Sequence, residues 1–364
     1  MKKTLTHLLL IAAAIAFTIY SCKKDHNPPP QPSGAQYNIN QTNLVADIAG
    51  FSAARVDTNL VNAWGLAVNP TGIVWLSSNH KSLSTVYDST GQTLKAPVTI
   101  PSFGNQGHGY PTGVVYNGTS SFISYSFIFA NEDGVITAWF SGGFAETMAD
   151  HRAQNAVYKG LAMAADGDAN FLYAANFFSG KIDVFDHFFN DVINKPFVDA
   201  TIPAGFAPFN IQNIGGMLYV TYAKQKGPDN SDDEAGPGNG YVNIFKPDGM
   251  FVKRFASKGT LNSPWGITHA PAGFAAASES ILVGNFGDGR INIFDLNGNY
   301  KGQLQNNGKP VGIEGLWALS FLKPTATSAD KLYFTAGPGD EAHGLFGYLK
   351  SSPVTQTTTG TIGN

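Results

Sequence analysis

Short runs of alternating hydrophobic and polar residues follow one another along most of the chain, separated by turns rich in Gly, Asn and Asp. Residues 180–185, Gly-Lys-Ile-Asp-Val-Phe, illustrate the pattern, because Ile and Val alternate with charged side chains before a closing aromatic residue. An alternation with a period of two predicts β-strands that bury one face. The pattern therefore predicts an all-β body.

The strands recur in sets of three, once every ~50 residues, which is a typical length for a propeller blade. The first strand of each set begins with one of the words Trp64-Gly65-Leu66, Thr112-Gly113-Val114, Lys159-Gly160-Leu161, Phe209-Asn210-Ile211, Trp265-Gly266-Ile267 and Trp317-Ala318-Leu319. The second strands are residues 75–79, 128–131, 172–176, 218–222, 282–285 and 332–336. The third strands end at Tyr87, Trp139, Phe185, Phe245, Phe294 and Tyr348. Six copies of the set predict a six-bladed β-propeller.

A fourth, outer strand is visible where a Gly turn is followed by another alternating run, as in residues 251–255 and 300–304. No such run follows the last set, whereas residues 37–45 form an orphan strand ahead of the first set. Pairing of these two ends would close the ring and remove exposed sheet edges. We therefore predict four-stranded blades over residues 37–350, in a ring that the N-terminal strand closes.

The N-terminus has the features of an export signal. Met1-Lys2-Lys3 is basic, and the apolar run of residues 8–19 is shorter than the ~20 residues that span a bilayer. Residues 1–21 are therefore predicted to be a signal peptide. Ser21-Cys22 resembles a lipobox, at which the signal is removed and the cysteine is acylated. Ordinary cleavage nearby, which would leave a free thiol, is the alternative.

Lipid on Cys22 would anchor the protein to a membrane, because each buried CH₂ contributes about 0.8 kcal/mol. The polar, Pro-rich residues 22–36 are predicted to be a flexible tether, and the Thr-rich residues 351–364 a disordered tail. We thus expect an exported, monomeric lipoprotein of the cell envelope. Since no Asp directly follows Cys22, the outer membrane of a Gram-negative bacterium is favoured.

Composition excludes several classes of function. The net charge is -3, and no run of Lys or Arg occurs beyond Lys23-Lys24, so nucleic acid is not an expected partner. Cys22 is the only cysteine, which excludes a disulfide framework, and its acylation would also exclude a thiol nucleophile. No Gly-x-Ser-x-Gly elbow, P-loop or dinucleotide fingerprint occurs.

Longer words carry a resemblance to a known family. The third strands, with their following turns, resemble NHL-repeat propellers and the wider TolB-like group. More specifically, residues 57–66, 207–216, 218–225, 283–289, 332–338 and 343–347 resemble a family of uncharacterised secreted bacterial six-bladed propellers. The resemblance runs from about residue 41 to residue 349 and implies the fold, but it implies no particular reaction.

Asparagines that end four of the second strands occupy one repeated position near the propeller axis, where they would form part of a ring: Asn79, Asn131, Asn176 and Asn285. Their carbonyl oxygens suit Ca²⁺, and Glu314 could add a negative charge. A resemblance to gluconolactonase and paraoxonase propellers implies a calcium ion in the central channel that polarises an ester or lactone carbonyl. The alternative is that these asparagines cap strand ends and turns.

A second polar set lies near the start of blade four, and it comprises Asn210, Gln212, Lys224 and Gln225. These side chains are candidates for binding a polar ligand, or alternatively for linking loops to one another. His343 stands where a third-strand glycine is expected and is the candidate general base.

These observations lead to two hypotheses of different classes. The first is a cell-envelope propeller that binds an unidentified glycan, peptide or protein. The alternative is a calcium-dependent lactonase-like or esterase-like hydrolase, or a lyase, with its site in the central channel. A bound divalent cation among convergent acids is required by the second hypothesis and not by the first.

Overall fold

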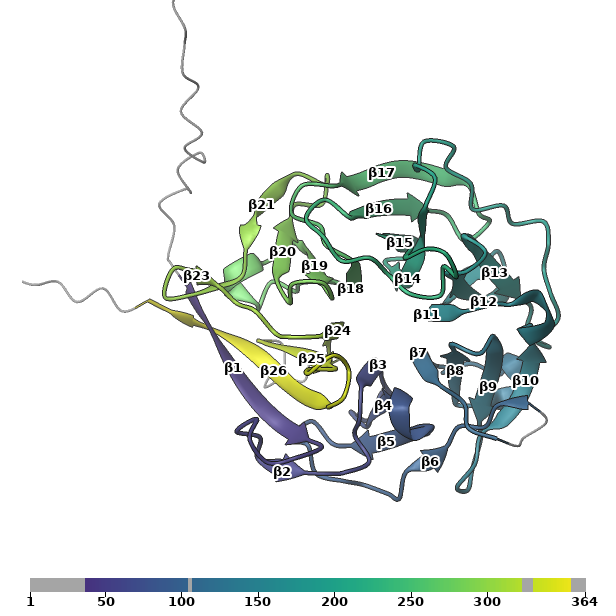
Figure 1. The fold of residues 1–364 in the computed structure, drawn as a ribbon, viewed down its shortest axis with the longest axis horizontal. Coiled ribbons are helices and arrows are strands. Elements are labelled where there is room, and N and C mark those ends of the chain that lie inside the picture. The colour runs from purple at the N-terminus through teal and green to yellow at the C-terminus, as the bar shows by residue number, and fades with distance from the viewer. Residues whose placement is uncertain (1–36, 104–106, 323–329, 355–364) are drawn as a thin grey trace, which may run out of the picture. The chain divides into compact units, whose positions relative to one another are not determined.

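A computed structural model describes residues 37–103, 107–322 and 330–354 of the chain. In these residues, six small antiparallel sheets stand around a common axis, each with its first strand innermost (Figure 1). The structure confirms the six-bladed β-propeller. The signal peptide, Cys22 and most of the tail predicted from the sequence lie outside the described residues.

The blades follow one another in chain order. Blade one consists of β3 (Ala63–Val68), β4 (Val74–Ser78), β5 (Leu83–Tyr87) and β6 (Val98–Thr99). Blade two consists of β7 (Pro111–Tyr116), β8 (Phe127–Asn131), β9 (Val135–Trp139) and β10 (Glu146–Asp150). Blade three consists of β11 (Tyr158–Asp166), β12 (Ala169–Asn176) and β13 (Lys181–Phe185). Blade four consists of β14 (Phe206–Ile214), β15 (Met217–Lys224), β16 (Gly240–Phe245) and β17 (Phe251–Ser257).

Blade five consists of β18 (Pro264–His269), β19 (Ile281–Asn285), β20 (Ile291–Phe294) and β21 (Tyr300–Gln303). Blade six consists of β24 (Leu316–Phe321), β25 (Lys331–Ala336), β26 (Leu345–Pro353) and β1 (Tyr37–Ala46). The shorter elements are β2 (Arg55–Val56), which is parallel to β1, and the hairpin of β22 (Gln305–Asn306) and β23 (Lys309–Pro310). Single 3₁₀ turns occur at η1 (Asn79–Lys81), η3 (Phe122–Ser124), η4 (Arg152–Gln154) and η5 (Ala275–Ala277).

The N-terminal strand closes the ring, as the sequence predicted. β1 pairs antiparallel with β26, from Tyr37 opposite Pro353 to Ala46 opposite Leu345. β26 extends to Pro353, three residues beyond the predicted boundary at residue 350, because the first residues of β1 supply backbone partners there. Ile39 of β1 is 1% exposed and packs into the core of blade six. Hydrophobic packing therefore stabilises the closure of the ring together with the backbone hydrogen bonds between β1 and β26.

Blade three is the exception to the four-stranded pattern. Its sheet has three strands in the described chain, and a single bridge between Phe185 and Asp191 takes the place of a fourth strand. Asp186 accepts hydrogen bonds from the backbone N–H groups of Phe188 and Asn190, which turns the chain tightly after β13. The chain then leaves this edge and crosses to blade four.

The core lies between neighbouring blades, because each sheet buries both of its faces. All six residues of β16, for example, are buried, and so are all five of β8. Strands covered on both sides are hydrophobic throughout and lose the simple alternation of a half-exposed sheet. In the part of the chain that the structure describes, no helix has the length and hydrophobicity needed to cross a membrane.

Candidate functional site at the propeller axis

The first strand of every blade contains an irregularity at the same place. The register shifts between Ala63 and Leu66, Pro111 and Val114, Tyr158 and Gly160, Pro208 and Asn210, Pro264 and Ile267, and Leu316 and Leu319. Such bulges bend a strand and redirect a side chain. The affected position carries the residue that opens each sequence word: Trp64, Thr112, Lys159, Phe209, Trp265 and Trp317.

Aromatic side chains at this position pack against one another across the blades. Trp64 and Trp317 stack with ring centroids 3.7 Å apart, and Phe286 covers the other face of Trp317 at 3.9 Å. Trp265 contacts Trp317 edge-on at 6.0 Å. The three Trp side chains are at most 4% exposed. An apolar plug therefore fills the space between blades one, four, five and six at this level.

Lys159 occupies the same repeated position in blade three, but its ammonium group is buried among carboxylates. Its Nζ lies 2.5 Å from Oε1 of Glu132 and 4.0 Å from Oδ1 of Asp232, and the side chain is 3% exposed. Nζ also lies 5.1 Å from the ring centroid of Trp64. Glu132 comes from the turn after β8, and Asp232 from the loop between β15 and β16. Residues from three blades thus meet around one cation.

Two amides extend this arrangement to blade six. Asn62 donates its Nδ2 hydrogens to Oε2 of Glu341, at 2.5 Å, and to Oδ1 of Asn79, at 3.4 Å. Asn79 in turn donates to Oε2 of Glu132 at 2.9 Å. Trp317 of the plug donates its indole N–H to Oδ1 of Asn62. We call the connected set the axial cluster: Asn62, Asn79, Glu132, Lys159, Asp232 and Glu341.

One carboxyl group of the axial cluster has a pKa close to 7. Burial, together with the nearby carboxylate of Glu132, raises the pKa of Glu341 to about 7. Burial alone would lower the pKa of Lys159, but the carboxylates of Glu132 and Asp232 raise it above its usual value. The cluster therefore holds a permanent ammonium group beside a carboxyl group that can gain or lose a proton near pH 7.

Of the four asparagines predicted as a ring, only Asn79 belongs to the axial cluster. Asn131 donates to the carbonyl of Val135 within its own turn. Asn176 accepts from the backbone N–H groups of Val157 and Ser179, and Asn285 accepts from that of Asn262. These three amides bond strand ends and turns, which was the alternative considered for them.

Glu314, the fifth predicted metal ligand, accepts a hydrogen bond from the backbone N–H of Gly339. Among the residues that the structure describes, no group of three or more His, Cys, Asp and Glu is arranged to hold a metal ion. The ammonium group of Lys159 instead lies at the centre of the acidic groups. The expectation of a calcium ion thus receives no support from the geometry of these donors.

The structure does not bring the second predicted polar set together. In the ladder of blade four, Gln212 lies opposite Tyr219, near the far end of β15 from Lys224. Lys224 forms an exposed ion pair with Glu234. Gln225 donates to the carbonyl of Phe177 and so links blades three and four. Strand register therefore separates the members of this set, and they do not converge on one site.

Asn210 from the same set has a structural role. Its side chain donates to the carbonyl of Trp265 in blade five, and a Cβ added to Gly160 in blade three would lie 2.2 Å from its Oδ1. His343, the predicted base, is also held structurally: its Nδ1 lies 3.0 Å from Oδ2 of Asp47, and its ring contacts Phe51. Neither described partner of His343 belongs to the axial cluster.

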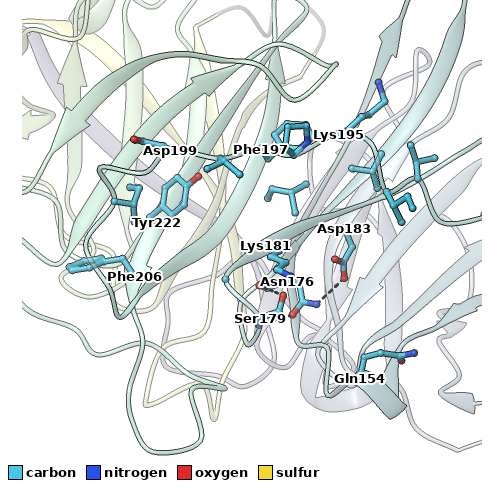
Figure 2. A pocket seen from close by; sticks show the side chains of 18 of the residues that line it. Gln154, Asn176, Ser179, Lys181, Asp183, Lys195, Phe197, Asp199, Phe206 and Tyr222 are labelled. Atoms are coloured by element: carbon cyan, nitrogen blue, oxygen red, sulfur yellow. Dashed lines mark hydrogen bonds between the residues drawn. The ribbon is translucent and has the colours of Figure 1, made fainter.

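A pocket of about 770 Å³ lies elsewhere, between blades three and four. Figure 2 shows Phe206 and Tyr222 on the opposite side of this pocket from Asn176 and Asp183. At its polar end, Nε2 of His151 lies 3.0 Å from Oδ1 of Asp191, and the hydrogen-bonded carboxylate of Asp183 raises the pKa of His151. We call this pocket the blade-three groove.

Sequence reasoning missed Lys159, Glu132, Asp232 and Glu341 as site residues. A signal existed at Lys159, because a lysine stands in a repeated word where three other blades have Trp. Its carboxylate partners lie in turns that differ in length from blade to blade. No local pattern therefore pairs them with the lysine.

Comparison with known proteins gives relatives in sequence. No model of a known protein family matches the chain. An uncharacterized protein of Acanthamoeba polyphaga mimivirus is 36% identical over 320 residues, covering 83% of this chain and 78% of the relative. A second uncharacterized protein of the same virus is 37% identical over 333 residues, covering 83% of each chain. Since these relatives are viral, the bacterial origin expected from the family resemblance is not supported.

Solved structures share the fold at low sequence identity. A protein of unknown function from Bacteroides thetaiotaomicron has a TM-score of 0.55 at 9% identity, covering 87% of this chain and 77% of its own. A streptogramin B lyase has a TM-score of 0.53 at 11% identity, covering 87% and 98%. An aldose sugar dehydrogenase from Streptomyces coelicolor has a TM-score of 0.51 at 16% identity, covering 88% and 99%. Enzymes thus occur among the structural neighbours, and the likeness concerns the fold alone.

Proposed function

We propose that this chain, which belongs to one family with these uncharacterized mimivirus proteins, is an exported propeller that binds a small cationic ligand at its axis. The ligand part of the proposal rests on the axial cluster. Export and attachment to a membrane through Cys22 are part of the proposal and rest on the sequence of residues 1–22. The propeller would then face the outside of the membrane on a short tether.

The observation that carries the proposal is the burial of Lys159 between carboxylates from different blades. Three acidic side chains held around one ammonium group are costly to assemble, and groups with perturbed pKa values concentrate at functional sites. Lys159 is nearly inaccessible, but Glu132 is 26% exposed and Asp232 is 55% exposed. The carboxylates therefore remain open to a ligand on the side away from the lysine.

The surrounding loops indicate the charge of the ligand. The loops between the second and third strands of the six blades lie on the same face as the axial cluster, because each inner strand begins there. Their acidic residues are Glu132, Asp133, Asp229, Asp232, Asp233, Glu234, Asp288, Asp340 and Glu341, against Lys81, Lys226 and Arg290. An excess of carboxylates on one face attracts cations and raises their local concentration.

The proposal is tested by calorimetric titration of the soluble protein, residues 34–364, with spermidine, Ca²⁺ and the neutral sugar trehalose. We expect a cation to bind, and Glu341→Gln or Asp232→Asn to weaken that binding about tenfold, since each removes a charge near the ligand. Glu279→Gln, which alters an exposed acid outside these loops, is the control and should leave the affinity unchanged. Equal affinities of wild type and both axial variants would contradict the proposal, as would binding of trehalose alone.

A second candidate function, a hydrolase or lyase, is favoured by the pKa of Glu341. A carboxyl group with a pKa of about 7 can act as a general acid or base at neutral pH. The test is a screen of lactones and esters at pH 6, 7 and 8. A turnover that depends on a single ionisation near pH 7 and is lost in Glu341→Gln would support this function, whereas turnover retained in the variant would exclude Glu341 as the catalytic group.

A further inference from the structure

Blade three is the one blade whose third strand lacks a strand on its outer side in the described chain. In the other blades, the beginning of the third strand is paired with an outer strand. The pairs are Leu83 with Thr99, Val135 with Asp150, Tyr241 with Ser257, Asn292 with Gln303, and Leu345 with Ala46. The propeller thus has one vacant place for a strand, at the beginning of β13.

The backbone at this edge is oriented to accept a strand. Val192 donates its N–H to the carbonyl of Val184 at 2.8 Å, which places the carbonyl of Val184 on the outer side of β13. Alternate residues of a strand direct their N–H and C=O groups to the same side. The N–H and C=O of Ile182 therefore also face outward. No described residue pairs with Ile182 on that side, because β13 has no outer ladder there.

The blade-three groove lies directly beside this edge. Apolar side chains line this groove and include Phe197, Ile202 and Phe206, of which Phe206 lies on the opposite side from Asn176 (Figure 2). Its volume of about 770 Å³ is within the range of known ligand sites (Figure 2). Ile193 and Val198, on the segment that borders the groove, are 97% and 63% exposed. Exposed apolar residues beside a groove are typical of an interaction site.

The two ends of the groove differ in charge. Lys181, at the beginning of β13, is exposed and has no ion-pair partner among the residues that the structure describes. Asp191, which bridges to Phe185 at the other end of the strand, shares the single imidazole of His151 with Asp183 in the middle of the strand. One negative charge therefore remains beside this end even when the imidazole is protonated. The groove is therefore positive at the start of β13 and negative at its end.

We propose that the blade-three groove binds an extended peptide of another protein, which adds to β13 as an antiparallel fourth strand with a basic residue beside Asp191 and an acidic residue beside Lys181. Strand addition of this kind takes affinity from main-chain hydrogen bonds and specificity from alternate side chains. Blade one shows that two paired residues suffice for a fourth strand, since β6 consists of Val98 and Thr99. The axial cluster takes no part in this binding.

Capped synthetic peptides test the proposal on the soluble protein. The probe is Lys-Thr-Val-Thr-Val-Thr-Glu, labelled for fluorescence anisotropy. Two control peptides have the same sequence with backbone N-methyl groups, one at the odd-numbered amides and the other at the even-numbered amides. A third control is the charge-reversed peptide Glu-Thr-Val-Thr-Val-Thr-Lys. We expect saturable binding of the probe, at least tenfold weaker binding of one methylated version, and about threefold weaker binding of the reversed peptide. Equal binding of probe and both methylated peptides would overturn strand addition, and so would the absence of binding at millimolar concentration.

A charge reversal on the protein provides the matched test. Lys181→Glu changes an exposed side chain, so folding should be unaffected, and the preference should shift toward the charge-reversed peptide. Lys309→Glu alters another exposed lysine in β23 and is expected to leave both affinities unchanged. If the Lys181→Glu variant prefers the same peptide as the wild type by the same factor in affinity, the assigned orientation is wrong and the proposal fails.

Discussion

At the scale of single residues, Lys159 shows how a repeat can both reveal and hide a functional side chain. The repeat fixes where the first strand of each blade begins, and hence that this position faces the axis. It does not show that Glu132, which lies 27 residues away, forms an ion pair with the lysine. The positions of the predicted asparagines were likewise readable from the repeat, but their partners depend on turn geometry, which a strand pattern does not contain.

Substitution of Lys159 by Met tests the energetic role of the buried ammonium group. Without it, the carboxylates of Glu132, Asp232 and Glu341 repel one another with no cation between them, and we expect the free energy of unfolding to fall by about 3 kcal/mol at pH 7. The loss should be smaller at pH 5. Burial raises the pKa of Glu341 above that of the unfolded chain, so its unfavourable contribution disappears as it takes up a proton below pH 7. Urea unfolding followed by Trp fluorescence at both pH values measures the difference.

Lys224→Met is the control for this experiment, because Lys224 forms a comparable but exposed ion pair with Glu234. Exposed pairs contribute about 0–1 kcal/mol, so this variant should unfold almost as the wild type does. A loss in Lys159→Met that is the same at pH 5 and pH 7 would show that packing, rather than charge, explains the destabilisation.

At the scale of elements, the sequence indicates the strands and the closure of the ring better than it indicates their edges. The sequence contained one unassigned strand ahead of blade one and one blade, the last, without an outer strand. Pairing the two was the one arrangement that satisfied both. The end of β26 and the incomplete sheet of blade three were not foreseen. Both depend on which backbone groups lie opposite one another, and hydrophobic alternation does not report this.

The closing strand gives a prediction at this scale. Ile39→Asp places a charge in the core of blade six, and we expect a loss of about 3 kcal/mol or more in the free energy of unfolding, or failure to fold. Asn40→Asp, one residue along β1 and on its exposed side, should change stability by less than about 0.5 kcal/mol. Thermal unfolding and gel filtration of the two variants distinguish them. If they behave alike, β1 does not hold the ring.

At the scale of the whole molecule, the uneven distribution of charge matters more than the net charge of -3. The acidic loops of one face are offset by basic residues elsewhere. Composition alone therefore predicted little about ligands beyond the exclusion of nucleic acid as a partner. The propeller could be foreseen because its repeat is periodic. The axial cluster could not, because it exists only once blades one, two, three, four and six have been brought around one axis.

The proposed lipid anchor on Cys22 gives a prediction at this scale as well. Cys22→Ser should prevent acylation, and we expect the expressed full-length protein to move from the detergent phase to the aqueous phase in Triton X-114 partitioning. Lys24→Ser, two residues away, should leave the protein in the detergent phase. Retention of Cys22→Ser in detergent would show that another feature of the chain holds it to the membrane.

The sharing of one sheet by β1 and β26 also sets the order of events during synthesis. Asn40 and Ser352, whose side chains are hydrogen-bonded across the two strands, are 312 positions apart. At 5–20 residues per second, roughly 15 s to a minute pass between the appearance of the two residues. Throughout that time, β1 lacks its partner β26, so most of its length stays an unpaired β-strand until the last blade is complete.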